Sequence, residues 1–151
     1  MKVWIDADAC PKLIKDILFR MAKRLQIESI LVSNNVLSIP ASPYIKKVQV
    51  PVEFDAADKY IIENIKENDL VITADVLLAD GVVSKKGTAL NPRGTLYTTQ
   101  NMKHHLSLRN LNTESRSAGI ITGGPSALSK KDVQLFANHL DKYLTKFTKP
   151  L

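Results

Sequence analysis

Carboxylates stand directly after two apolar runs of the sequence. Asp6 and Asp8 follow the run at 3–5, and Asp75 follows the run at 70–73. In a parallel sheet the carboxyl ends of neighbouring strands meet at one edge, which is where ligands bind in sheets of this kind. If the two runs are adjacent strands, the three carboxylates share one small volume. They then repel each other unless a cation or a proton neutralises them.

Three further aspartates extend this set. Asp55 and Asp58 open a segment with helical apolar spacing, and Asp80 follows Asp75 on a second such segment. Clustered oxygen ligands without His or Cys partners favour a hard cation, Mg²⁺ or Mn²⁺, which polarises a phosphoryl oxygen and lowers the pKa of bound water. Singly, Asp55, Asp58 and Asp80 are explained equally well as helix N-caps or as solvated surface residues. The predicted metal ligands are Asp6, Asp58, Asp75 and Asp80, and the predicted catalytic residues are Asp6, Asp8, Asp58 and Asp75.

Two other segments offer contacts for a phosphate group. Thr122, Gly123 and Gly124 can form a nest of backbone N–H groups, although a plain glycine turn explains them nearly as well. The segment at 91–94 is typical of a tight turn, and it presents Arg93 either to phosphate or only to solvent. These four residues are the predicted phosphate-binding set.

The sequence around the cysteine and the paired histidines predicts structural roles for these residues. Cys10 lies at a helix start, which favours a thiolate, but Asp6 and Asp8 nearby oppose that charge, so we expect a buried thiol. A single cysteine also excludes an internal disulfide and a cysteine-cluster zinc site. His104 and His105 are adjacent and therefore point to different sides of a helix, which is poor spacing for metal ligands.

The elements that position these groups alternate between strand and helix. Such alternation predicts a three-layer α/β domain with a mainly parallel sheet and right-handed crossovers. Ser129 and Asp132 resemble a capping box at the start of the last helix. The expected strands are 3–5, 30–32, 48–50, 70–73 and a short one before 91, and the expected helices are 11–25, 56–65, 76–85, about 101–111, and one from 129 onward.

Composition and net charge limit the class of protein, its partners and its location. The 151 residues are 44% hydrophobic and 24% charged, which is typical of one soluble globular domain spanning residues 1–151. The net charge of +6 favours an anionic partner such as RNA or another phosphate-bearing substrate, although it also serves solubility. No apolar run is long enough to span a membrane, and Asp6 interrupts the first run too early for a signal peptide. We therefore expect a cytoplasmic protein, with its oligomeric state open.

Five motifs lie along the chain at 4–11, 54–58, 69–75, 89–94 and 121–125. In this order they resemble the motifs of the bacterial YaiI/YqxD family, over essentially the whole chain. This resemblance implies a PIN-like α/β domain, whose characterised relatives are ribonucleases that use Mg²⁺ or Mn²⁺ held by three or four acids. It also implies that Asp6 is the acid of the first strand, Asp58 that of the middle helix and Asp75 that after the later strand. Asp8 and Asp80 are then possible extra ligands.

Three functional hypotheses follow. The first is a metal-dependent phosphodiesterase that cleaves RNA. The second is a haloacid-dehalogenase-type phosphatase, because Asp6 and Asp8 resemble its DxD motif, with Asp6 as nucleophile and Asp8 as acid/base. Pro11 starts a helix too soon for the hairpin insert usual after that motif, so this hypothesis ranks second. The third is a non-catalytic RNA-binding or interaction module that contacts mainly phosphates, because aromatic residues are only 6% of the chain.

Overall fold

The centre of the protein is a twisted sheet, seen in a computed structural model that describes residues 1–53, 55–108 and 128–148. Within these residues the sheet has six strands in the order β3-β2-β1-β4-β5-β6. The first five strands in this order are parallel to their neighbours, and β6 pairs antiparallel with β5. The strands are β1 Val3–Asp6, β2 Ser29–Ser33, β3 Ile45–Gln49, β4 Leu70–Ile72, β5 Thr88–Leu90 and β6 Leu96–Tyr97.

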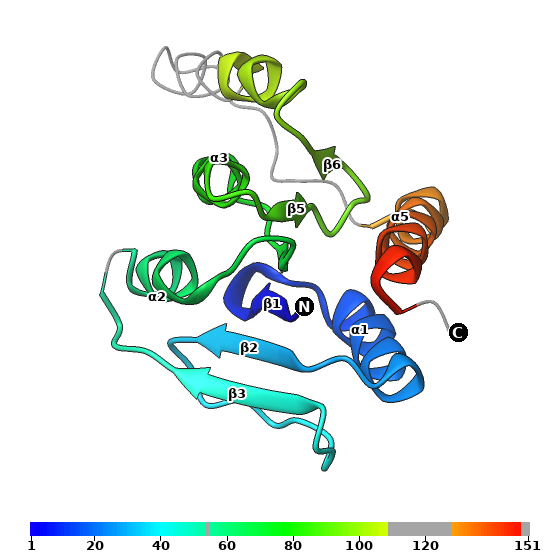
Figure 1. Ribbon diagram of the computed structural model, residues 1–151. Coiled ribbons are helices and arrows are strands. Elements are labelled where there is room, and N and C mark those ends of the chain that lie inside the picture. The colour runs from blue at the N-terminus through cyan, green and yellow to red at the C-terminus, as the bar shows by residue number, and fades with distance from the viewer. Residues whose placement is uncertain (54, 109–127, 149–151) are drawn as a thin grey trace.

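Helices cover both faces of this sheet. Helices α1 and α5 lie on one side and α2 and α3 on the other (Figure 1), and a helical segment at 102–108 packs beside β6. A single α/β domain with three layers results, as the alternating pattern predicts. The helices are α1 Lys12–Leu25, α2 Ala56–Asn64, α3 Val76–Ser84 and α5 Lys130–Thr148, and a short 3-10 helix, Ala7–Ala9, links β1 to α1.

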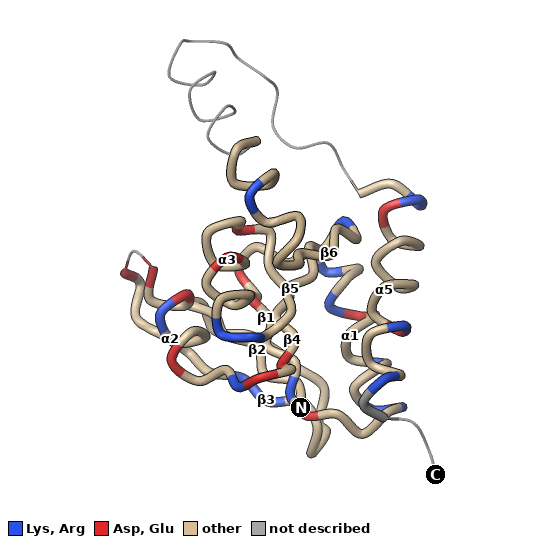
Figure 2. The backbone as a smooth tube through the Cα atoms, turned by 45° about the horizontal axis from the view of Figure 1, so that its top comes forward, with Lys and Arg blue, Asp and Glu red and all other residues tan. Residues whose placement is uncertain are grey.

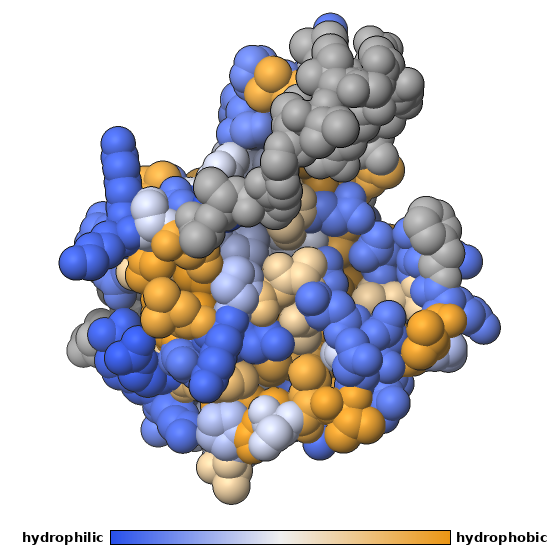
Figure 3. Space-filling model, turned by 180° about the vertical axis from the view of Figure 1, so that it is seen from behind, coloured by the Kyte–Doolittle hydropathy of each residue, from blue (hydrophilic) through white to orange (hydrophobic). Residues whose placement is uncertain are grey.

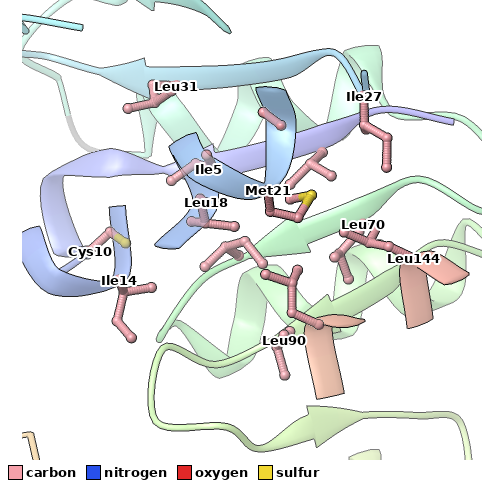
Figure 4. Packing of buried hydrophobic residues seen from close by; sticks show 14 of the residues in the cluster. Ile5, Cys10, Ile14, Leu18, Met21, Ile27, Leu31, Leu70, Leu90 and Leu144 are labelled. Carbon is pink, nitrogen blue, oxygen red and sulfur yellow. The ribbon is translucent and has the colours of Figure 1, made fainter. Parts of the chain in front are cut away.

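Alternation along each strand divides the core in two. Val3 and Ile5 of β1 belong to the cluster under α1 and α5, whereas Trp4 belongs to the cluster under α2 and α3. Both faces of a parallel sheet are buried, so its strands are apolar throughout rather than alternating with polar residues. Figure 4 shows the first cluster, in which Leu18 and Leu144 approach the sheet from α1 and α5. Each fully buried side chain of this size contributes roughly 1.5–3 kcal/mol.

Most expected elements are confirmed within one or two residues. The capping box also forms, because the Ser129 hydroxyl accepts a bond from the Asp132 N–H and the Asp132 carboxylate accepts one from the Ser129 N–H, both over 3.1 Å. Strand β3 begins earlier than expected, because exposed Lys46 and Lys47 conceal an edge strand that is buried mainly at Ile45. The expected helix at 101–111 is seen at 102–108, and its remainder lies outside the described residues.

The surface is mixed, and α1 and α5 are amphipathic. In Figure 3, one side of the molecule shows separate hydrophobic patches among hydrophilic residues. Within the described part of the chain, no helix is long and apolar enough to cross a lipid bilayer.

Candidate functional site

Asp6 and Asp75 lie at the same edge of the sheet, because β1 and β4 are neighbours. Thr73, the residue after β4, connects them. Its hydroxyl donates a hydrogen bond of 3.0 Å to Oδ2 of Asp6 and accepts one of 3.0 Å from the backbone N–H of Asp75. The condition set by the sequence, that the two apolar runs be adjacent, is therefore met.

Asp75 begins helix α3. Its Oδ1 accepts hydrogen bonds from the backbone N–H groups of Leu77, at 2.9 Å, and Leu78, at 3.4 Å. This is the bonding of an N-cap residue, and it fixes the carboxylate at the positive end of the helix. The sequence reasoning assigned such capping to other aspartates and did not foresee it here.

Asp6 is a buried carboxylate near other negative charges. Only 9% of its surface is exposed. Burial raises the pKa of Asp6, the hydrogen bond from Thr73 lowers it, and the charges of Asp75 and Asp8 raise it again, with a net increase. The carboxyl thus gains from neutralisation by a proton or a cation.

Asp58 brings a third carboxylate to this edge from the first turn of α2. Partial burial and the charges of Asp75, Asp6 and Asp55 raise the pKa of Asp58 to about 7. Burial is the largest cause of this shift, and the contributions of Asp75 and Asp6 indicate that the three carboxylates lie near one another. Within the described residues none of these three acids forms an ion pair with Lys or Arg. Negative charge therefore accumulates here without an ion-pair partner in the described part of the chain.

Asp8 has a different environment although it is close in sequence to Asp6. Its carboxylate accepts hydrogen bonds from the Ser33 hydroxyl, from the Asn34 N–H at 2.9 Å and from the Asn35 side-chain amide at 3.0 Å. Burial raises the pKa of Asp8, but these three bonds and the charge of Lys15 outweigh it, so the pKa is lowered. Asp8 stays ionised and holds the loop after β2 against the end of β1.

The remaining two aspartates are less involved. Asp55 stands at the N-cap position of α2 with a φ of 63°, and its side chain caps none of the described N–H groups. Its contribution is its charge, which helps to raise the pKa of Asp58. Asp80 lies half-buried on α3 and is not among the groups that raise the pKa of Asp6 or Asp58. Its predicted role as a ligand stays a prediction.

A cavity of about 560 Å³ opens beside these acids between α2 and α3. Asp58 and Asp75 contribute to its wall, together with the apolar side chains of Ile62, Leu77 and Leu78. Within the described residues, no three His, Cys, Asp or Glu side chains are already arranged to hold a metal ion. A cation bound by Asp6, Asp58 and Asp75 therefore requires their carboxylates to draw together.

The predicted phosphate contacts are only partly described. Arg93 lies in a tight turn, in which its backbone N–H donates to Asn91 Oδ1 over 2.8 Å. Its guanidinium donates to Asp132 on α5 over 2.9 Å, so it fastens the turn to that helix. Thr122, Gly123 and Gly124 lie outside the described residues.

Cys10 is buried, His104 is exposed and His105 is partly buried. Burial raises the pKa of the Cys10 thiol to about 12, so this group is an inert part of the core, as predicted. The His105 ring packs edge-on against Tyr97, with 4.9 Å between the ring centroids. Within the described residues neither histidine belongs to a group that could hold a metal ion.

Asp69 is an important acid that the sequence reasoning did not single out. Its carboxylate accepts hydrogen bonds from the Lys2 N–H, the Trp4 indole and the Lys66 N–H, at 2.9, 3.0 and 2.9 Å. It precedes β4 and so lies at the edge of the sheet opposite the acidic cluster. An acid before a strand, rather than after it, was the available signal that its role is structural.

Comparison with known proteins places this arrangement in a family. The family described as "Uncharacterized BCR, YaiI/YqxD family" matches residues 4–146. The chain belongs to this family. Its relatives include a UPF0178 protein of Janthinobacterium sp. (strain Marseille), 51% identical over 146 residues that cover 97% of both chains.

Two further members agree with this. A UPF0178 protein of Maridesulfovibrio salexigens is 53% identical over 97% of both chains. One from Legionella pneumophila subsp. pneumophila is 55% identical over 97% of this chain and 99% of its own length. No solved structure matches the chain significantly. The resemblance stated from five motifs is therefore confirmed at the level of the family.

Proposed function

We propose that the protein is a metal-dependent phosphodiesterase that cleaves RNA, with Asp6, Asp58 and Asp75 as the residues that hold the metal. One observation carries the proposal. Carboxylates from β1, α2 and α3 lie near enough for the charges of Asp75 and Asp6 to help raise the pKa of Asp58 to about 7. Carboxyl groups with strongly raised pKa values cluster at functional sites, where their charge or their proton takes part in the chemistry.

The chemistry of these donors fits Mg²⁺ or Mn²⁺. All three are carboxylates, and hard divalent cations prefer oxygen ligands. When bound, the metal supplies a Lewis acid for the phosphoryl oxygen and a water of lowered pKa. Asp80, five residues further along the chain on α3, is a candidate for a fourth ligand.

The protein's own residues prepare the site in distinct ways. Thr73 orients the carboxylate of Asp6, and the N-terminal N–H groups of α3 orient that of Asp75. With its pKa near 7, the Asp58 carboxyl is about half protonated at neutral pH, and it releases this proton when a cation takes its place. The hydrogen bonds to Asp8 keep it ionised, so it does not exchange protons near neutral pH. Its role in the proposal is to hold the loop after β2 in position.

The substrate is proposed to be RNA because of the charge of the whole chain. A net charge of +6 on a protein with a local acidic site attracts a polyanion. Sparse aromatic residues favour contacts with phosphates over base stacking. Phosphate contacts by Arg93, Thr122, Gly123 and Gly124 remain part of the proposal.

The phosphatase alternative is disfavoured by Asp8. In that mechanism Asp8 must donate a proton to the leaving group, yet the hydrogen bonds from Ser33, Asn34 and Asn35 lower its pKa. The chain also enters the 3-10 helix directly after β1, without a hairpin insert. Asp6 as a nucleophile is therefore the second candidate, and a non-catalytic RNA-binding module is the third.

Single-turnover assays test the proposal. RNA, single-stranded DNA and a panel of phosphomonoesters are incubated with Mn²⁺ and the wild-type protein, Asp6→Asn or Asp75→Asn. Glu67→Gln serves as the matched control, because this exposed acid precedes β4 at the opposite edge of the sheet. Cleavage of RNA that is lost in both aspartate variants and kept in the control supports the proposal.

The other outcomes separate the alternatives. Hydrolysis of phosphomonoesters with an aspartyl-phosphate trapped at Asp6 favours the phosphatase. RNA cleavage that persists in both aspartate variants refutes the metal-carboxylate site. Binding of RNA without any turnover leaves the non-catalytic module.

A further inference from the structure

A second cavity lies on the other side of the sheet, between α1 and α5, with a volume of about 650 Å³. Ile17 and Met21 of α1 and Leu140 of α5 give it an apolar floor, and Arg20, Arg24 and Asp141 stand around it. None of these residues belongs to the acidic cluster. We refer to this cavity as the α1–α5 groove.

The two helices that form the groove are basic. Helix α1 has five Lys and Arg residues and a single acid, and α5 has four Lys residues and two acids. Figure 2 shows basic residues along both helices and acidic residues around α2 and α3. The charge of the protein is therefore divided between its two helical layers, and the groove lies in the positive one.

Arg20 and Arg24 expose their side chains to solvent beside the groove. Both are exposed, and among the described residues Arg20 has no ion pair. Arg24 pairs with Asp141 over 3.4 Å, but both side chains are 64% exposed. An ion pair so exposed contributes little to stability and is readily exchanged for another anion.

The spacing of the two arginines suits a strand of phosphates. They are separated by one helical turn, so their side chains start about 5–6 Å apart on the same face of α1. Each guanidinium can hold a phosphate through two parallel N–H bonds. The apolar floor between the helices offers a surface for sugars and bases without requiring aromatic stacking.

Helix α1 also connects the groove with the candidate catalytic site. The short 3-10 helix Ala7–Ala9 joins the end of β1, where Asp6 lies, to the start of α1 at Lys12. From there α1 runs for 14 residues, or about 21 Å, past Arg20 and Arg24. An extended strand held at the acidic edge can thus continue along this helix.

We propose that the α1–α5 groove binds the phosphodiester backbone of single-stranded RNA, with Arg20 and Arg24 as phosphate contacts remote from the carboxylates. This inference rests on the proposed function for the choice of RNA as ligand. It adds a second binding site, which anchors the part of the strand that is not being cleaved.

Binding of a fluorescein-labelled single-stranded RNA, followed by anisotropy in EDTA, tests the inference without cleavage. Arg20→Ala/Arg24→Ala is expected to weaken binding about tenfold. The dependence of log K on log salt should become shallower by about 0.7 for each arginine lost. The control is Lys66→Ala/Lys86→Ala, which removes the same charge near the ends of α2 and α3 and should change the affinity less than twofold.

Two further variants distinguish direct phosphate contact by the arginines from an indirect effect of the substitutions on the fold. Arg20→Lys/Arg24→Lys keeps the charge but not the bidentate geometry, so its salt dependence should match the wild type while its affinity is intermediate. Asp141→Asn frees Arg24 from its ion pair and should tighten binding. The inference would be overturned if Arg20→Ala/Arg24→Ala bound RNA as tightly as the control Lys66→Ala/Lys86→Ala. It would also be overturned if a dinucleotide bound the wild-type protein as tightly as the long strand does.

Failure here is distinguishable from failure of the proposed function. If Asp6→Asn binds RNA like the wild type but does not cleave it, and the arginine variant binds weakly, both proposals stand. If the wild type cleaves nothing and the arginine variant still binds weakly, the groove remains an RNA site and the catalytic proposal falls. If cleavage is retained and the arginine variant binds normally, only the groove proposal falls.

Discussion

The hydroxyl of Thr73 donates a hydrogen bond of 3.0 Å to the carboxylate of Asp6, across the boundary between β4 and β1. The same hydroxyl accepts a bond from the N–H of Asp75. Thr73 is only 1% exposed, so water does not replace either contact if the hydroxyl is lost. One side chain therefore sets the relative position of two proposed metal ligands.

Thr73→Val is expected to lower metal-dependent RNA cleavage by roughly 10- to 100-fold, the usual effect of removing a partner of a metal ligand. The pKa of Asp6 should rise further, because the bond that lowers it is gone. The cleavage profile should then move to higher pH. Thr73→Ser retains the hydroxyl and should restore both rate and profile, whereas a valine variant with wild-type kinetics would contradict the positioning role.

Asp58→Asn is expected to stabilise the metal-free protein at pH 8 while abolishing its stabilisation by Mn²⁺. The variant removes a carboxylate that burial, Asp75 and Asp6 make unfavourable when ionised. Thermal unfolding with EDTA and with millimolar Mn²⁺ measures both effects, since a ligand that binds the folded state raises Tm. Glu67→Gln should change neither value, and an Asp58→Asn protein that responds to Mn²⁺ like the wild type would rule Asp58 out as a ligand.

Stability of the metal-free protein should increase as the pH falls from 8 to about 5. The folded-state pKa of Asp58 is about 7, above its unfolded value of 3.8, so the folded protein binds the proton more tightly. Protonation through this window relieves the burial and the repulsion of the Asp58 charge, which are fully present only above about pH 8. Asp8 and Glu28 have lowered pKa values, so their contributions are lost only at still lower pH.

Denaturant unfolding at several pH values measures this dependence. Asp58→Asn should flatten the curve between pH 5 and 8 and leave the loss at acid pH unchanged. A wild-type protein that becomes less stable from pH 8 to 6 would contradict the shift assigned to Asp58. Added Mn²⁺ should reverse the trend, because cation binding requires ionised carboxylates and strengthens as the pH rises through 7.

The sequence predicted those elements whose signal is local. Continuous apolar runs identify β1, β2 and β4, and helical spacing identifies α1 and α5, because burial on both faces or on one stripe leaves a direct pattern. Strand β6 has only two residues, and β3 is an edge strand with two exposed lysines, so neither has a clear periodicity. Their existence depends on pairing with β5 and β2.

The candidate site was predicted in part for the same reason. Asp6 and Asp75 follow strands, so a parallel sheet alone brings them to one edge. Asp58 lies on a helix, and only the packing of α2 determines that it approaches them. The restraint of Asp8 by the loop after β2 depends on the position of β2 beside β1, which no local pattern contains.

Asp69→Ala should destabilise the protein by about 3 kcal/mol, since three buried or partly buried donors lose a charged acceptor. In a domain of this size that corresponds to a fall in Tm of roughly 10 °C. Asp69 stands at the opposite edge of the sheet from Asp6, so cleavage of RNA at a temperature where the variant is folded should match the wild type. Thermal unfolding followed by Trp4 fluorescence measures the first effect, and single-turnover kinetics measure the second. Cleavage lost from a fully folded Asp69→Ala protein would show that the functional site extends beyond the acids at the carboxyl edge.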